Sequence, residues 1–174
     1  AVGSSNCTLI NNTISIYNRS QPFHAIHMEY GSRGNSLSGT TITANNYIRD
    51  DATSTGNNMT DTLIVAEDGS VLFQGTQNIS TGISVNGTNL NISLNRTYLN
   101  SSQLSFINTT AQIILSGINL ISPQIMVALH DSNFSVCTDC RNISYTGNIF
   151  VFNVSHFTTY RINEIAVLVT PTSA

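Results

Sequence analysis

The chain has 174 residues, of which 40% are hydrophobic and only 9% are charged, and its formal net charge is -3. All six basic residues are arginine and none form a cluster, which argues against nucleic acid or an anionic membrane surface as a partner. The lack of lysine also excludes Schiff-base chemistry, a P-loop and a Lys–Asn isopeptide crosslink.

Strand patterns follow one another along the whole chain, and helix signals are nearly absent. Clusters of Asn, Gly, Ser and Asp separate the runs, and the clusters at 67–70 and 146–148 have hairpin spacing. The predicted strands are Thr8–Tyr17, Phe23–Tyr30, Thr40–Ile48, Thr62–Ala66, Val71–Gln74, Ile79–Val85, Leu90–Leu94, Leu104–Ile107, Ile113–Ile121, Ile125–His130, Phe134–Cys137, Ile143–Tyr145, Ile149–Val154 and Thr159–Val169. No internal repeat or linker stands out. We therefore expect an all-β fold, namely one antiparallel β-sandwich of immunoglobulin-like or pilin-like type.

The N-terminal segment, residues 1–18, is the predicted donor-strand segment that carries the function, and residues 19–174 are the predicted sandwich domain. Ile10, Ile14 and Ile16 share one strand phase and Leu9 lies beside them, while polar residues occupy the other phase. Such a strand can be donated to a neighbouring sandwich that lacks one, which is called β-augmentation. Alternatively, Thr8–Tyr17 pairs within its own sandwich, and the sequence leaves both possibilities open.

The longest polar break is 49–61, which contains Asp50, Asp51 and Asp61. Clustered carboxylates suit calcium, but their spacing lacks the alternation of known calcium loops, so turns and caps are the favoured interpretation.

Sequons of the form N-x-Ser/Thr are unusually frequent and fall mostly on the polar phase of predicted strands. For example, Asn153 opposes Phe150, Phe152 and Val154. The predicted N-glycosylation sites are Asn6, Asn11, Asn18, Asn58, Asn78, Asn86, Asn91, Asn95, Asn100, Asn108, Asn133, Asn142 and Asn153. Together with a start at Ala1 rather than Met, this pattern predicts a secreted cell-surface glycoprotein whose signal peptide has been cleaved. No apolar run is long enough to span a membrane.

The chain has three cysteines, Cys7, Cys137 and Cys140. We expect a Cys137–Cys140 disulfide, which leaves Cys7 unpaired or bonded to another molecule; a bridge from Cys7 to one of the pair is the rival. His130 and His156 could complete a zinc site only by coincidence of folding. His24 and His27 are expected at the surface, and no catalytic motif or cofactor site is found.

Residues 142–160, NISYTGNIFVFNVSHFTTY, resemble the closing strands of β-sandwich modules in archaeal surface proteins, and the CTDCRNISY lead-in is similar to a cysteine pair seen in some of them. The overall character also resembles the archaeal extracellular filaments called threads. This resemblance implies a non-enzymatic glycosylated subunit that joins identical subunits head to tail by donating its N-terminal strand. The alternative is a non-filament surface module, such as an S-layer-associated adhesin, and a secreted hydrolase is a third, weaker possibility. Because carboxylates are few, we also expect the assembly to tolerate mild acid.

Overall fold

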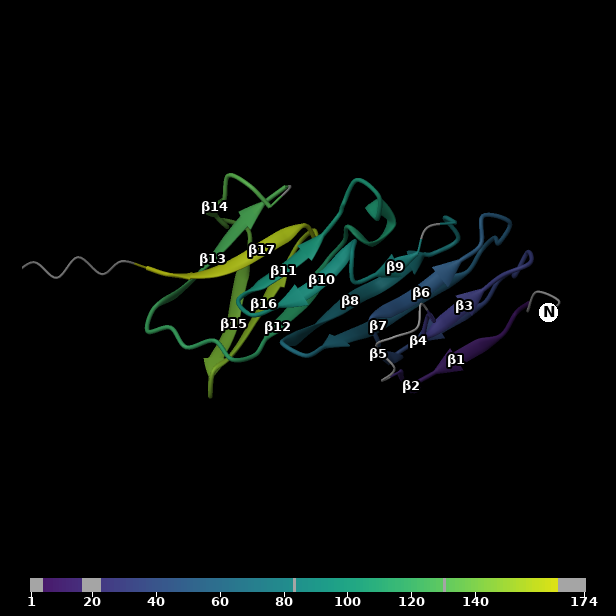
Figure 1. Cartoon of the computed structure of the whole chain (residues 1–174), viewed down its shortest axis with the longest axis horizontal. Coiled ribbons are helices and arrows are strands. Elements are labelled where there is room, and N and C mark those ends of the chain that lie inside the picture. The colour runs from purple at the N-terminus through teal and green to yellow at the C-terminus, as the bar shows by residue number, and fades with distance from the viewer. Residues whose placement is uncertain (1–4, 17–22, 83, 130, 166–174) are drawn as a thin grey trace, which may run out of the picture.

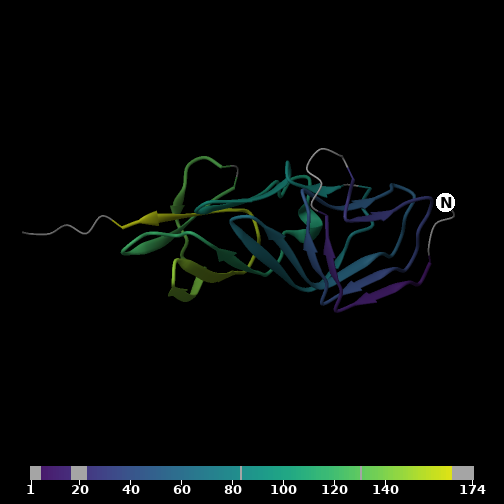
Figure 2. The same ribbon diagram turned by 60° about the horizontal axis from the view of Figure 1, so that its bottom comes forward.

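The computed structural model describes residues 5–16, 23–82, 84–129 and 131–165, and these are almost entirely β-strands and loops. Figures 1 and 2 show an elongated molecule with β1, β2 and β3 at one end and β13, β14 and β17 toward the other. The elements are β1 (Thr8–Ile10), β2 (Thr13–Ser15), β3 (Ile26–Met28), β4 (Ser36–Ser38), β5 (Thr41–Thr43), β6 (Asn46–Asp50), β7 (Asn58–Ala66), β8 (Gly69–Asn78), β9 (Val85–Asn86), β10 (Leu90–Ser93), β11 (Arg96–Leu99), the 3₁₀-helix η1 (Ser105–Ile107), β12 (Ala111–Leu115), β13 (Pro123–Ala128), β14 (Ser135–Val136), β15 (Arg141–Thr146), β16 (Ile149–Val154) and β17 (Thr159–Glu164).

The strands of the described residues form three sheets that pack as in a sandwich, which confirms the predicted all-β fold. The largest has nine strands in the order β1-β4-β7-β8-β12-β16-β15, with β2 and β5 attached through β7. A five-stranded sheet follows the order β10-β11-β17-β13-β14, and β3-β6-β9 form the third. Their buried side chains make one cluster that extends from Met28 to Ile162.

The N-terminal part of the nine-stranded sheet is built from three stacked layers whose strands run parallel, which differs from the antiparallel pairing expected throughout. We call residues 6–16 layer 1, residues 34–44 layer 2 and residues 56–66 layer 3. Thr8 pairs with Ser36, 28 residues later, and Ser36 pairs with Asn58, 22 residues later. The layers are therefore an internal repeat, contrary to expectation. Layers 2 and 3 share the pairs Gly34/Gly56, Asn35/Asn57, Thr40/Thr62, Ile42/Ile64 and Ala44/Ala66.

Each layer turns two corners in the left-handed region of backbone space, and these corners explain why β1 and β2 are separate strands. The first corner has φ of 55° at Asn6, 61° at Gly34 and 68° at Gly56; the second comprises Asn11, Gly39 and Asp61, with φ of 52°, 57° and 46°. Gly and Asn adopt this conformation most readily. The predicted continuous strand Thr8–Tyr17 is thus broken at its Asn11 corner.

A ladder of buried asparagines joins the layers between the corners. The Oδ1 atom of Asn57 accepts a 2.9 Å hydrogen bond from the backbone N–H of Asn35, whose own Oδ1 accepts a 3.0 Å bond from the backbone N–H of Cys7. Asn57 also donates from Nδ2 to Ser32 O and to Asp50 Oδ1. Because buried polar groups need partners, these contacts fix the register between layers.

Two other strand predictions are corrected, and two further strands were missed. Leu104–Ile107 forms a helical turn rather than a strand, because Leu104 N–H donates to Asn100 O and Ile107 N–H donates to Leu104 O. The predicted strand Ile79–Val85 is reduced to β9, which begins only at Val85. Two strands, β4 and β11, were not predicted because their short, polar sequences carry a weak alternation.

The C-terminal strands match their sequence patterns closely. Phe150, Phe152 and Val154 of β16 are buried, as the alternation predicted, and the hairpins β7–β8 and β15–β16 form at the predicted turns. Tyr160 packs against Phe152 and donates from its hydroxyl to His156 O at 2.6 Å. This resembles the tyrosine corner of other β-sandwiches. The described residues contain no helix with the length and hydropathy of a membrane span.

Candidate functional site

Layer 1 is the outermost layer of the stack, and one edge of it faces solvent. Leu9 and Ile10 are 39% and 61% exposed, whereas Leu37 directly beneath Leu9 is 3% exposed and Ile42 beneath Ile14 is 0% exposed. All three residues of β1 are exposed, and Ile14 and Ile16 are half-buried. Leu9 and Ile14 therefore have only part of the burial that Leu37 and Ile42 have in layer 2.

In the isolated chain, layer 1 pairs with layer 2 of the same chain. Asn6 N–H and Asn11 N–H donate to Arg33 O and Ser38 O, and Ser36 N–H and Thr41 N–H donate back to Cys7 O and Asn12 O. The side chains of Asn6 and Asn11 lie over Gly34 and Gly39, where a Cβ atom on either glycine would collide with the amide oxygen above it. Layer 1 is thus held by backbone hydrogen bonds along one strand edge and by the asparagine–glycine contacts at its two corners. Residues 1–4 and 17–18 of the predicted donor segment lie outside the described residues.

Within the part of the chain that the structure describes, the nine-stranded sheet has a second unpaired edge at β15. Arg141–Ser144 and Thr146 are exposed, and Ile143 is 45% exposed. Figure 1 places β1 and β15 at opposite sides of the elongated molecule. Unpaired edges present backbone donors and acceptors that can bind another strand.

None of the described sequon asparagines is buried. Asn6, Asn11, Asn78, Asn108, Asn133 and Asn142 are exposed, and Asn58, Asn86, Asn91, Asn95, Asn100 and Asn153 are half-buried. Asn18 lies outside the described residues. The fully buried asparagines, Asn35, Asn57 and Asn89, are all outside sequons. The structure therefore leaves the acceptor amides within reach of solvent and keeps the ladder amides inside.

Cys137 and Cys140 form the predicted disulfide, and Cys7 is free and exposed. The side chains of Cys137, Asp139 and Cys140 lie together, but the disulfide takes both sulfur atoms and leaves no thiolate to bind a metal. His130 lies outside the described residues. His24 and His27 pack with ring centroids 6.3 Å apart, and burial, followed by the charges of Arg49 and His27, lowers the pKa of His24.

A Ser–His–Asp cluster, not singled out in the sequence, lies beside the disulfide. The Ser155 hydroxyl donates to Asp139 Oδ2 at 2.7 Å and lies 3.1 Å from His156 Nδ1, which is 3.7 Å from Asp139 Oδ2. This hydroxyl is the main cause of the lowered pKa of Asp139, with His156 a smaller one. A catalytic triad needs Ser and Asp on opposite nitrogens of the ring. Here both approach Nδ1, so the cluster fastens the disulfide loop to the end of β16 and lacks a triad's geometry.

The three aspartates of the polar break at 49–61 accept hydrogen bonds in turns and caps, which is the interpretation that the sequence favoured. Asp50 accepts from Asn57 and Gly82, Asp51 from Thr53 and Tyr30, and Asp61 from Gly75. Asp50 is 2% exposed, and burial raises its pKa despite these hydrogen bonds. Among the described residues, the three carboxylates do not gather at one potential metal position.

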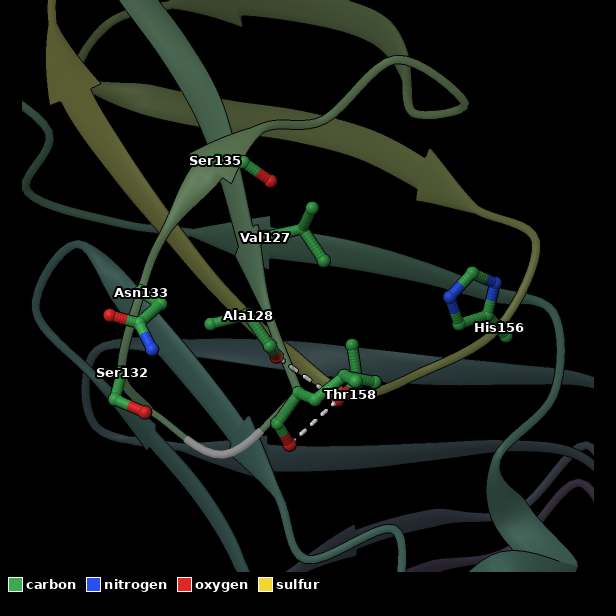
Figure 3. A pocket seen from close by; sticks show the side chains of 8 residues that line it. Val127, Ala128, Ser132, Asn133, Ser135, His156 and Thr158 are labelled. Carbon is green, nitrogen blue, oxygen red and sulfur yellow. Dashed lines mark hydrogen bonds between the residues drawn. The ribbon is translucent and has the colours of Figure 1, made fainter.

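A cavity of about 500 Å³ opens between the β13–β14 connection and the segment after β16. In Figure 3, Ser132 and Asn133 lie on one side and His156 on the other, and the Thr158 hydroxyl donates to Ala128 O and Leu129 O. The Thr158 proton is used internally, and the other polar side chains of the lining are Ser132, Asn133, Ser135 and His156.

Comparison with protein-family models, with curated proteins and with solved structures finds no match for this chain.

Proposed function

We propose that the protein is a structural subunit of an N-glycosylated extracellular filament of archaeal type, joined head to tail through its N-terminal strands. The observation that carries this proposal is the incomplete burial of layer 1. Leu9 is 39% exposed although Leu37, directly below it in layer 2, is buried, and Ile10 beside it is 61% exposed. Covering them with a neighbouring subunit removes apolar surface from water, at about 25 cal/mol per Å².

Layer 2 is the surface that would receive a donated layer 1. Its edge offers Asn35 Oδ1 to a backbone N–H and two glycine corners to two asparagine side chains. The contacts that layer 1 makes in one chain can all be made with layer 2 of a neighbour, which is donor-strand exchange by swapping. The connection after layer 1 is longer than the one after layer 2, since the pairing offsets are 28 and 22 residues. A longer connection gives the reach that such an exchange needs.

Sequon placement and composition support an extracellular setting for such a filament. The described sequon asparagines are all unburied, and only nine carboxylates are present. One of these carboxylates, Asp50, has a raised pKa in the folded state. The raised pKa favours the folded state in acid, which fits the tolerance of acid that we expect.

The alternative function is a non-filament surface module, such as an adhesin. It is favoured by the pairing of layer 1 with layer 2 of the same chain, which already satisfies one edge of β1 and β2.

Negative-stain microscopy of the purified chain tests the proposal. We expect wild-type protein to form filaments and the double variant Leu9→Asp/Ile14→Asp to stay monomeric, because charges cannot be buried at the joint. Ile121→Asp is the matched control, since Ile121 is 95% exposed and far from layer 1 in sequence, and it should assemble normally. Wild-type protein that stays monomeric at every concentration tried would favour the surface module.

A trans-complementation experiment tests the joint itself. A variant that lacks residues 1–16 should stay monomeric and should bind a synthetic peptide of residues 5–16 with a rise in its Tm. A peptide of scrambled sequence should not bind. If filaments form but the peptide does not bind, the subunits join through another surface.

Glycosylation is tested by mass. Protein from a native host should lose the mass of several glycans on enzymatic or chemical deglycosylation, and an unmodified mass would contradict this part of the proposal.

A further inference from the structure

Two of the six arginines lie side by side on the outer face of the five-stranded sheet. Arg96 of β11 is directly opposite Arg161 of β17 in an antiparallel pair. Opposed residues project from the same face with Cβ atoms about 4.5–5.5 Å apart. Their neighbours Thr97 and Tyr160 are fully buried on the other face, so both guanidinium groups point away from the core.

Only one of the two charges is neutralised within the described residues. Asp131 Oδ2 lies 2.6 Å from Arg96 Nη2, and the Asp131 and Arg96 side chains are 44% and 31% exposed. Arg161 has no carboxylate within salt-bridge distance there; its guanidinium instead covers the Phe134 ring at 4.2 Å. Like charges directly opposite one another destabilise a sheet. In a chain with so few charges, this pair with only one neutralised charge suggests that an anion completes the site.

Aromatic rings hold the two guanidinium groups in place, and their Nη groups are left to bind a ligand because both Nε atoms are buried. Phe134 packs against the face of Arg161, and Arg96 lies 5.4 Å from the centre of the Tyr98 ring. Stacking uses the face of the guanidinium and leaves its five N–H donors in the plane. The Nε atoms of both arginines are buried without a hydrogen-bond partner among the described residues. Two pre-oriented guanidinium groups suit a carboxylate or a sulfate group.

The surrounding face carries amide and hydroxyl side chains that suit sugar hydroxyls. Ser93 of β10 is directly opposite Arg96, and Asn163 and Gln124 form the next pair along β17 and β13. These side chains are all partly exposed. Ser93 also lines a cavity of about 700 Å³, whose other lining includes Asn45, Tyr47, the carboxylates of Glu67 and Asp68, and Ile16 of layer 1. This cavity gives room for neutral sugar rings beside the acidic group.

We propose that Arg96 and Arg161 form a binding site for an acidic carbohydrate, whose carboxylate or sulfate group lies between the two guanidinium groups. Asp131 occupies part of this site in the absence of ligand and is displaced from Arg96 when the anion binds. The two arginines lie on a different sheet from layer 1.

Calorimetric titration of the full chain at low salt tests this site with three oligosaccharides of equal length. These are oligogalacturonate, which carries carboxylates, a sulfated oligogalactose and neutral oligogalactose. We expect at least one of the acidic sugars to bind tenfold or more tightly than the neutral one, with affinity that falls as salt rises. The comparison between the two acidic sugars identifies the anionic group. Equal affinity for all three, or no binding, overturns the proposal.

Variants assign the binding to these residues. Arg161→Gln should lower the affinity for the preferred acidic sugar at least tenfold, whereas Arg141→Gln, on the exposed β15 edge, should leave it unchanged. Asp131→Asn should raise the affinity severalfold, because it frees Arg96 from its competing carboxylate. A purely structural ion pair predicts no gain in affinity. If Arg161→Gln fails to fold, the exposed Asp131→Asn variant still decides: no gain overturns the proposal.

Discussion

The layered N-terminal region and the aromatic C-terminal region use the same strand alternation but stabilise it differently. In the three layers, equivalent positions stack on one another, so each layer buries the one beneath it. In the C-terminal region, Phe150, Phe152 and Tyr160 interlock across two sheets, with ring centroids 5.7 and 5.9 Å apart between neighbours. The aromatic core is closed on all sides, whereas the stack ends in an incomplete layer. The difference indicates why assembly is expected at the layered end.

The largest expected effect comes from the aromatic core. Phe152→Ala should lower the free energy of unfolding by about 3–5 kcal/mol, because it removes a fully buried ring and leaves a cavity. Leu9→Ala in layer 1 should cost less than about 1 kcal/mol, since Leu9 is already 39% exposed. Denaturant unfolding of the monomeric chain measures both. Equal losses would show that layer 1 is covered in the monomer.

The two asparagines of the ladder, Asn35 and Asn57, should contribute unequally to the free energy of unfolding. Asn57→Ala leaves Asn35 N–H without its partner and removes one of the hydrogen bonds to the Asp50 carboxylate, and the unsatisfied N–H should cost about 1–3 kcal/mol. Asn35→Ala should cost less, because the partner it deprives in layer 1 is Cys7 N–H near the exposed end. Hydrogen exchange should then accelerate in layer 1 for Asn35→Ala and in layers 1 and 2 for Asn57→Ala. Identical exchange patterns would contradict a layered stack.

Alanine substitutions at two glycines, Gly39 and Gly147, distinguish the cost of backbone strain from the cost of a lost contact between layers. Gly39 and Gly147 have φ of 57° and 58°, but a Cβ atom meets Asn11 at Gly39 and nothing within 4 Å at Gly147. Alanine at either should cost about 1–2 kcal/mol from the left-handed conformation. Only Gly39→Ala should also speed amide exchange in layer 1. Acceleration by both variants, or by neither, would refute the proposed corner contact.

The smallest expected effect is on the pH dependence of stability, which should differ in sign between the buried carboxylate of Asp50 and the exposed carboxylate of Asp139. Because burial raises the pKa of Asp50 above 3.8 in the folded state, its contribution to stability is present in full below pH 3.8 and is lost as pH rises through the raised value. Asp139 behaves oppositely: its pKa is lowered, so its contribution is present above pH 3.8 and is lost as pH falls through the lowered value. Thermal unfolding between pH 2 and 7 should therefore show wild type gaining stability relative to Asp50→Asn on acidification, and losing it relative to Asp139→Asn. Parallel curves for the three proteins would contradict both assignments.

The sequence determined the all-β class, the β15–β16 hairpin, the buried phase of β16 and the Cys137–Cys140 disulfide, because each depends on residues close together in the chain. It also contained the layers, since a comparison of 34–44 with 56–66 aligns Gly34 with Gly56 and Ile42 with Ile64. Three features were decided only by the tertiary structure. These are the parallel pairing of the layers, the position at which layer 1 ends, and the pairing of Arg96 with Arg161. These features join residues 22 to 65 positions apart, and no local pattern specifies which strand edges will meet. Burial of the shared apolar face and satisfaction of the backbone hydrogen bonds select among those pairings only when the whole chain folds.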